Sequence, residues 1–184
     1  NSGEYDANNW ELEFVGFLPG KRESRRYVGD YIMTQNDVRN EGKFDEALHS
    51  LDKAIALNPN EAMPYFSIAI VFHHIGEYET AYENYTKAIE LNHKMIDAYY
   101  NRAQALLADK DASNEKLKSA IADFDKAIEL DPKFIDALYY KAVVQKKLEN
   151  YKGAIETLDK VLAIEPKAVY SNALKKLILQ KYLK

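Results

Sequence analysis

The chain has 184 residues, of which 47% are hydrophobic, and 25 Lys and Arg against 29 Asp and Glu give a net charge of -4. The absence of Cys excludes thiol catalysis, thiolate metal sites and disulfide frameworks. The acidic balance argues against a nucleic-acid-binding fold, and no apolar run reaches the ~20 residues that a membrane-spanning helix needs.

Residues 1–27 are predicted to form an N-terminal extension that differs from the rest of the chain. Large apolar residues crowd one part of it, and these are Trp10, Leu12, Phe14, Val15, Phe17 and Leu18. A soluble protein avoids leaving such a patch in water. We therefore expect the extension to cover an apolar surface of its own chain or of a neighbouring copy, which makes self-association through the extension an expectation.

Residues 9–44 contain Arg-Glu-Ser-Arg-Arg at 22–26, Gly-Asp-Tyr at 29–31, Thr34, and Asp-Val at 37–38. With these motifs the stretch resembles a segment of the FAD-dependent oxidoreductase family. The resemblance implies a place near flavin or substrate for Arg22, Arg25 and Arg26. The chain has no Gly-x-Gly-x-x-Gly motif that follows a predicted strand, so we expect no bound cofactor. Two origins stay open, a remnant of a gene fusion or a decayed first repeat with a coincidental motif.

From residue 28 onward the sequence repeats itself. Variants of Gly-Lys-Phe-Asp-Glu-Ala-Leu begin at 42, 76 and 149, and variants of Lys-Ala-Ile-Ala-Leu-Asn-Pro begin at 53, 87, 126 and 160. The aligned alanines Ala47, Ala81, Ala120 and Ala154 lie 34, 39 and 34 residues apart, so the third repeat holds a five-residue insertion. A period in this range indicates stacked pairs of helices.

Residues 28–168 resemble the tetratricopeptide repeat family, whose unit is a pair of helices that cross at small residues and end at a Pro. The resemblance defines repeats 1 to 4 as residues 28–61, 62–95, 96–134 and 135–168. The small-residue column of the first helices holds Gln35, Ala69, Ala103 and Ala142, of which only Gln35 departs from the pattern. The resemblance implies an all-α, right-handed superhelical solenoid of about four helix pairs, the first of them imperfect.

Each repeat is predicted to end at a residue that stops its second helix. The stop column holds Pro59, His93, Pro132 and Pro166, and Pro ends a helix because it lacks the amide donor and clashes with the preceding turn. The insertion falls within 108–116, where Ser113 or Asn114 is predicted to cap the next helix. It is either a longer hairpin or a contact for a partner.

Residues 169–184 are predicted to form a C-terminal capping helix. Its apolar face is predicted to consist of Tyr170, Ala173, Leu174, Leu177, Ile178 and Tyr182. A terminal helix that is apolar inward and polar outward is what the end of a solenoid needs. Because residues 167–184 hold five Lys and no acidic residue, a basic helix on a membrane surface is the alternative.

The sequence offers no catalytic or metal site. His73 and His74 are adjacent, so on a helix they point about 100° apart and do not share a metal. Motifs for phosphate loops, zinc hydrolases and serine hydrolases are absent. Asp123 and Asp125 are predicted to lie on a solvated face. We therefore expect a protein that is not an enzyme and holds neither metal nor cofactor.

The resemblance implies a binding surface, because the first helices of tetratricopeptide repeats line a concave groove. The residues that the rule assigns to this groove are Met33, Asn36, Phe66, Ile70, His73, Tyr100, Asn101, Gln104, Tyr139, Tyr140, Val143 and Lys147. Tyr offers contact area and a hydroxyl at low entropic cost. Some of these side chains are alternatively expected to pack between repeats.

A subset of the family holds the C-terminal carboxylate of chaperone tails with Lys, Asn and Arg. The corresponding positions here hold Ile32, Asn36, Ser67, Asp97 and Asn101. Because the cations are missing, recognition of an acidic C-terminus is disfavoured.

The predicted function is a non-enzymatic scaffold that binds a peptide or helix segment of a protein partner in an aromatic and apolar groove. The alternative is a subunit or fusion remnant of a flavin-dependent oxidoreductase. Nucleic acid is not an expected partner. Asn1 in place of Met indicates a processed chain or a fragment, which leaves open the removal of a targeting signal. The compartment therefore stays open, with the cytoplasm slightly favoured.

Overall fold

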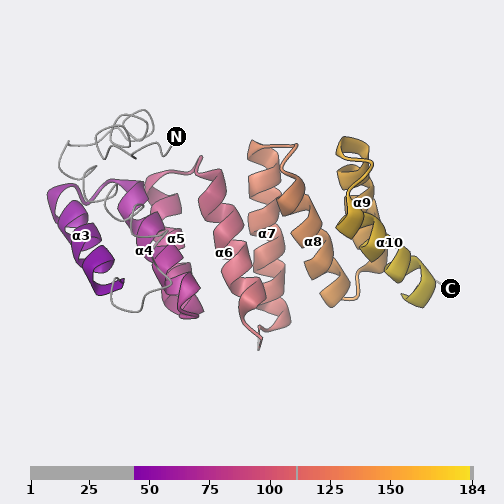
Figure 1. Cartoon of the computed structure of the whole chain (residues 1–184), viewed down its shortest axis with the longest axis horizontal. Coiled ribbons are helices and arrows are strands. Elements are labelled where there is room, and N and C mark those ends of the chain that lie inside the picture. The colour runs from indigo at the N-terminus through magenta and orange to yellow at the C-terminus, as the bar shows by residue number, and fades with distance from the viewer. Residues whose placement is uncertain (1–43, 111, 183–184) are drawn as a thin grey trace, which may run out of the picture. The chain divides into compact units, whose positions relative to one another are not determined.

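The computed structural model describes residues 44–110 and 112–182, and these fold into eight α-helices with no strand among them. The helices are α3 (Phe44–Leu57), α4 (Ala62–His74), α5 (Tyr78–Leu91), α6 (Ile96–Ala108), α7 (Asn114–Leu130), α8 (Ile135–Lys147), α9 (Tyr151–Ile164) and α10 (Val169–Tyr182) (Figure 1). The all-α prediction is therefore confirmed.

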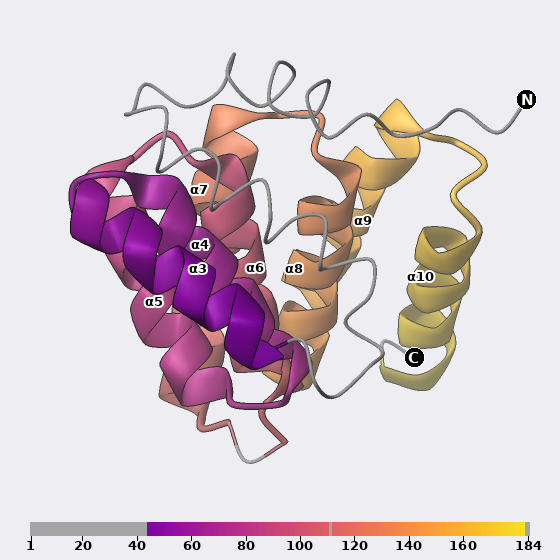
Figure 2. The ribbon, with the colours of Figure 1, turned by 60° about the vertical axis from the view of Figure 1, so that its left-hand side comes forward.

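The helices belong to two compact units, which divide between His93 and Lys94. In the first unit α3 packs on α4 and α4 on α5, and in the second unit each helix from α6 to α10 packs on the next (Figure 2). The pairs α4 with α5, α6 with α7 and α8 with α9 correspond to repeats 2, 3 and 4, and α3 is the second helix of repeat 1. The predicted extension and the first helix of repeat 1, with Gln35, lie outside the described residues.

The alanines of the repeat pattern form the contacts between helices. Ala47, Ala81, Ala120 and Ala154 are at most 2% exposed, and the first-helix alanines Ala69, Ala103 and Ala142 are fully buried. A methyl side chain lets two helix backbones approach closely, and larger side chains then interdigitate around the crossing. In the first unit Leu51, Ile68 and Val71 fill the core beside these alanines.

The second helices end at the predicted stop column even where Pro is missing. α5 ends before His93. The residue that follows the helix, Asn92, is extended with φ -143°, and so is Asp131 (φ -135°) before Pro132, while Glu165 before Pro166 has φ -129°. The amide of each of these three residues still donates to the carbonyl four residues earlier. The last helical hydrogen bond is therefore the same at all three sites, and the chain leaves the helix directly after it.

The turns inside repeats 2 and 4 use a left-handed residue at the same position. Gly76 has φ +86°, and Glu149 has φ +60°. In both turns the next amide reaches back to the carbonyl five residues earlier, from Glu77 to Phe72 and from Asn150 to Gln145, at 2.9 Å each. Only Gly adopts this conformation without steric cost, so Glu149 is strained.

The insertion lengthens a helix as well as a loop. Ser113 caps α7, because its hydroxyl accepts the amide of Lys116 at 3.3 Å. α7 has 17 residues, whereas the other second helices have 14. The predicted cap is confirmed, and three residues of the added length are helical.

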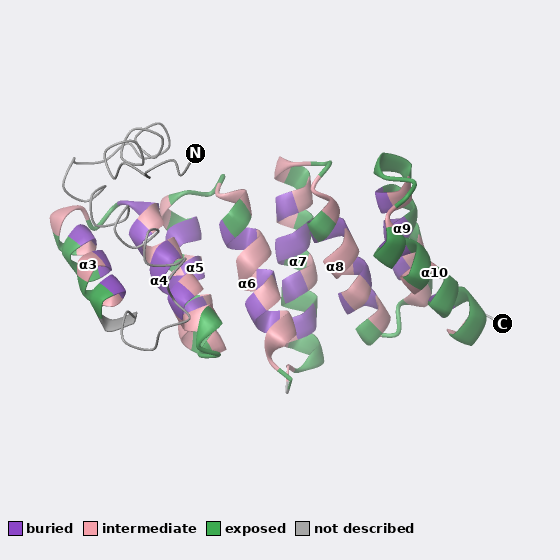
Figure 3. Cartoon of the chain, viewed as in Figure 1, coloured by how far each residue is buried: buried purple, intermediate pink, exposed green. Residues whose placement is uncertain are grey.

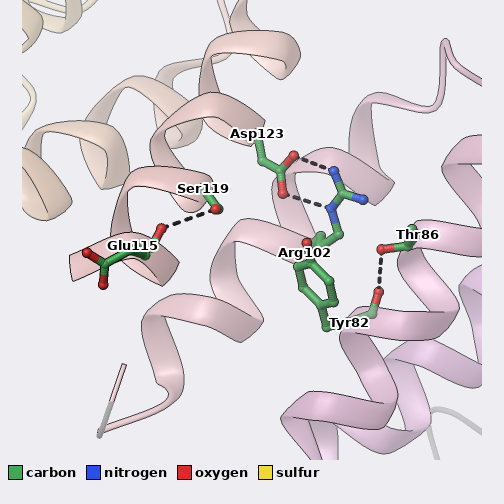
Figure 4. A network of polar contacts seen from close by, with 6 residues as sticks. All are labelled: Tyr82, Thr86, Arg102, Glu115, Ser119 and Asp123. Carbon is green, nitrogen blue, oxygen red and sulfur yellow. Dashed lines mark hydrogen bonds and ion pairs between the residues drawn. The ribbon is translucent and has the colours of Figure 1, made fainter. Parts of the chain in front are cut away.

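The prediction that Asp123 lies on a solvated face is wrong. Its side chain is 8% exposed, and it forms a bidentate ion pair with Arg102 at 2.8 Å and 2.6 Å (Figure 4). Burial raises the pKa of Asp123, against the lowering effect of Arg102. Asp125 is exposed as predicted and pairs with Lys141. The two aspartates point to different sides of α7. Asp123 faces α6, which carries Arg102, and Asp125 lies on the side of α8, which carries Lys141.

The capping helix is present, but only half of its predicted apolar face is packed. Ser171 and Ile178 are buried, and Leu174, Lys175 and Tyr182 are half-buried, whereas Tyr170, Ala173 and Leu177 are exposed (Figure 3). The predicted face was too wide to be covered by α9 alone. α10 packs on α9 through buried Ser171 and Ile178, with Lys175 paired to Asp159 of α9, and its Tyr170 side stays exposed.

Among the helices within residues 44–110 and 112–182, none combines the length and the hydropathy of a membrane-spanning segment. Neither do these ranges contain a group of three or more His, Cys, Asp or Glu side chains that could hold a metal ion.

Candidate functional site

The predicted groove residues of repeats 2 to 4 lie on α4, α6 and α8, the first helices of their pairs. Met33 and Asn36, the members from repeat 1, lie outside the described residues. Phe66, Ile70 and His73 belong to the first compact unit, and the remaining members belong to the second. The groove is therefore described as two separate sets.

In the first unit the predicted residues surround a buried tyrosine of α5. The ring centroid of Tyr85 lies 5.7 Å from that of Phe66 and 6.3 Å from that of His73, and its hydroxyl lies 3.4 Å from His73 Nδ1. His73 also meets Tyr78 edge-on at 5.6 Å. Burial lowers the pKa of His73. These contacts hold the two helices of repeat 2 together, so Phe66 and His73 pack within one repeat and not between repeats, which was the alternative expected from the sequence.

In the second unit Tyr100 lies at the centre of an aromatic cluster. Its ring centroid lies 4.9 Å from that of Phe134, 6.0 Å from that of Phe124 and 6.3 Å from that of Tyr140. The Gln104 amide donates to the Tyr100 hydroxyl at 2.9 Å. Burial raises the pKa of Tyr100, while the hydrogen bond from Gln104 opposes the rise. These contacts hold the Tyr100 side chain on α6 in one orientation in the protein without a ligand.

The α8 part continues this cluster. Tyr139 and Tyr140 meet edge-on with ring centroids 5.2 Å apart, and both are half-buried. Burial raises the pKa of Tyr139, and the hydroxyls of Tyr140 and Tyr170 add to the rise. Val143, one turn further along α8, is half-buried, and Lys147 at the end of the helix is exposed.

Asn101, like Gln104, uses its polar group within its own helix. Its amide donates to the carbonyl of Asp97 at 2.8 Å, one turn back on the same helix. Asn101 is half-buried, and Asp97 itself is exposed at the start of α6. Asp136 is likewise exposed at the start of α8. The two aspartates make the edge of this surface at the N-terminal ends of α6 and α8 acidic.

Sequence reasoning did not predict the exposed aromatic and apolar side chains of α10. Tyr170 is 78% exposed and Leu177 44% exposed. Both were assigned to the packed face of a cap. Counting the 34-residue period one step beyond repeat 4 places Tyr170 in the column of Asp97 and Asp136, which is the signal that would have found it.

Family models describe most of this region as repeats of one kind. Three models described as tetratricopeptide repeat, or TPR repeat, match residues 50–83, 71–110 and 112–177. No curated protein matches the chain significantly. The matching models lend no support to the resemblance to a FAD-dependent oxidoreductase, which falls on residues outside the described ranges.

Solved structures of repeat proteins share the fold. A crystal structure of MamA protein has 23% identity and a TM-score of 0.71, over 84% of this chain and 81% of that one. The first TPR of Spaghetti (RPAP3), bound to the HSP90 peptide SRMEEVD, has 20% identity and a TM-score of 0.60, over 67% and 94%. The second TPR domain of human RPAP3, in complex with the HSP70 peptide SGPTIEEVD, has 26% identity and a TM-score of 0.55, over 61% and 90%.

Proposed function

Because this chain is an all-α tetratricopeptide repeat solenoid, we propose that it is a non-enzymatic scaffold whose second compact unit binds a segment of a partner protein. The observation that carries the proposal is the cluster of half-exposed tyrosines, Tyr100, Tyr139 and Tyr140, on α6 and α8. Solved relatives of this fold that hold peptides support it.

The cluster has the properties of a surface prepared for binding. Its rings are held by edge-on contacts and by the hydrogen bond from Gln104 to Tyr100, so little side-chain freedom remains to be lost when a ligand binds. Tyr combines a large apolar area with a hydroxyl, and it is enriched among the residues that dominate binding energies. Val143 adds an apolar contact one turn from Tyr139.

The partner segment that fits this surface is internal to its chain. Where the chaperone-tail subset places cations, the second unit holds exposed Asp97, and the amide of Asn101 is occupied by the Asp97 carbonyl. An aspartate repels a terminal carboxylate. An extended or helical segment with apolar anchors avoids this conflict.

The flavin-dependent alternative has no observation in its favour among the described residues. Self-association through residues 1–27 also stays a prediction, because those residues lie outside the described ranges.

The proposal is tested by selecting binders from a library of random linear peptides displayed on phage, with the full chain as bait. Enriched peptides are then synthesised and titrated by calorimetry against three proteins, the parent, Tyr139→Ala, and Lys160→Ala as an exposed control on α9. We expect Tyr139→Ala to weaken binding by about 1 to 3 kcal/mol, with Lys160→Ala unchanged.

Tyr139→Phe separates the roles of ring and hydroxyl, since it keeps the ring contact with Tyr140 and removes only the hydroxyl. Circular dichroism of each variant verifies that the helices are intact. Failure to enrich any peptide, or equal affinities for the parent and a folded Tyr139→Ala variant, contradicts the proposed function.

A further inference from the structure

α10 docks on α9 in the way that α8 docks on α7. Lys141 of α8 pairs with Asp125 of α7 at 2.5 Å, and Lys175 of α10 pairs with Asp159 of α9. Each partner of the second pair lies 34 residues after its counterpart in the first. α10 therefore occupies the place of the first helix of a fifth repeat.

The turns that lead into the two helices agree with this equivalence. The amide of Phe134 donates to the carbonyl of Asp131 at 3.1 Å before α8, and the amide of Ala168 donates to the carbonyl of Glu165 at 3.1 Å before α10. These positions are again 34 residues apart. The helices start in the same register, so residues 34 apart along them take corresponding positions.

The register identifies which side of α10 continues the surface of α8. Tyr139, Val143 and Lys147 correspond to Ala173, Leu177 and Lys181, and exposed Asp136 corresponds to Tyr170. On an α-helix, residues 170, 173 and 177 share one face because they are three and four positions apart. The exposed apolar stripe of α10 therefore lies in the columns that the tyrosine surface occupies on α8.

The opposite side of α10 differs from that of α8. On α8, Leu138 and Ala142 are buried, with Ala142 packed against Ala154 and Leu158 of α9. The corresponding residues of α10 are Asn172 and Lys176, both exposed. A lysine in the position of the crossing alanine prevents another helix from approaching as α9 does.

Charge indicates the chemistry of a segment that fits this stripe. α10 contains lysines and no acidic residue, and Tyr170 replaces the aspartate that begins α6 and α8. Lys147 and Lys181 stand in the same column at the C-terminal ends of α8 and α10. The whole chain has a net charge of -4, so this basic edge differs from the rest of the protein. It attracts anionic groups locally.

We propose that α10 is the last row of the peptide-binding surface, and that Tyr170 and Leu177 contact apolar side chains of a partner segment whose acidic residues lie toward Lys147 and Lys181. This proposal rests on the proposed function, which it extends from two first helices to three. The partner is thus an apolar segment with Asp or Glu at one side.

The test uses the peptides selected on the full chain and a matched pair of α10 variants, Leu177→Ser and Leu179→Ser. The two leucines are 44% and 45% exposed, and they lie on different sides of the helix. We expect the dissociation constant to rise about tenfold for Leu177→Ser and for Tyr170→Ser, and to stay unchanged for Leu179→Ser.

The charge part is tested with the double variant Lys147→Met with Lys181→Met. For the parent, binding should weaken several-fold between about 50 and about 300 mM salt, and the double variant should lose most of this dependence. Selected peptides should be enriched in Asp and Glu as well as in large apolar residues.

The outcomes separate this proposal from the one it rests on. If Tyr139→Ala weakens binding and Leu177→Ser does not, the tyrosine surface binds peptides and the α10 extension is wrong. A larger effect of Leu179→Ser than of Leu177→Ser overturns it as well, because the outer side of α10 is then the contact. If no peptide binds, both proposals fail together.

Discussion

Replacing Ile178 or Leu177 of α10 by Ala should have very different effects on stability. Ile178 is fully buried against Ala142, Ala154 and Leu158, whereas its neighbour Leu177 is 44% exposed. Truncation of a buried Ile to Ala removes transfer free energy and leaves a cavity, which together cost about 2 to 5 kcal/mol. For Leu177 about half of the side chain is already in water and no closed cavity forms, so about 1 kcal/mol or less is expected.

The assay is urea unfolding of the full chain followed by circular dichroism, because the unfolding free energy reports directly on packing. Ile178→Ala should lower it by about 3 kcal/mol, toward the middle of the range, since a terminal helix can relax into the space. Leu177→Asp should likewise be tolerated, because the side chain at this position reaches water. An equal or larger loss for Leu177→Ala than for Ile178→Ala would refute the described orientation of α10.

Three further predictions concern the backbone, the buried ion pair and pH. In urea unfolding, Gly76→Ala should destabilise the chain by about 1 kcal/mol, and Glu149→Gly should stabilise it by roughly 0.5 to 1 kcal/mol. The reason is that both positions have a left-handed backbone conformation, which favours Gly. Effects of the opposite sign would contradict the strain at Glu149. Asp123→Ala should cost about 3 kcal/mol by removing the buried carboxylate that accepts two hydrogen bonds from Arg102, and Arg102→Met with Asp123→Leu should recover much of this loss; a neutral Asp123→Ala would contradict the burial of the pair. Because burial lowers the pKa of His73 in the folded chain, the unfolded chain binds its proton first, so the unfolding free energy should fall as pH drops below about 6.5. His73→Gln should flatten this slope more than His74→Gln, because burial is the larger cause of the lowered His73 pKa and the neighbouring His74 the smaller one.

The fold could be predicted from the sequence because its determinants repeat. A crossing alanine, a stop residue and a small set of apolar positions recur at 34-residue spacing, and each instance confirms the others. Ala103 or Ala142 alone would not predict where two helices cross. The column they form fixes which side of each helix approaches its neighbour, and Ser113 then marks where the inserted segment becomes helical.

The details that could not be predicted depend on contacts between distant residues. Helical spacing shows that Asp123 and Asp125 point to different sides, but not that Arg102, 21 residues earlier, pairs with Asp123. The orientation of α10 depends on Asp159 of the preceding helix. The predicted apolar face was wide enough to pack in either of two ways, and a single sequence does not decide between them.

The candidate site was predicted in its residue types more than in its roles. Tyr100 and Tyr139 pack against neighbouring rings and also remain partly exposed to solvent, because groove positions on a first helix also lie beside the next helix of the repeat. His73 and Phe66 pack on Tyr85, so their aromatic character is used inside the helix pair. Sequence periodicity cannot separate these uses, since both require a large side chain at the same position.

The central claim, that the tyrosine surface of α6 and α8 binds a protein segment, is tested most directly by photo-crosslinking. Tyr139 is replaced by p-benzoylphenylalanine in the full chain, and in a second protein Glu156, exposed on α9, is replaced in the same way. Each protein is irradiated with a library-selected peptide, and the adducts are identified by mass spectrometry. The account predicts a peptide adduct from position 139 and none from position 156, and an adduct from position 156 alone would contradict it.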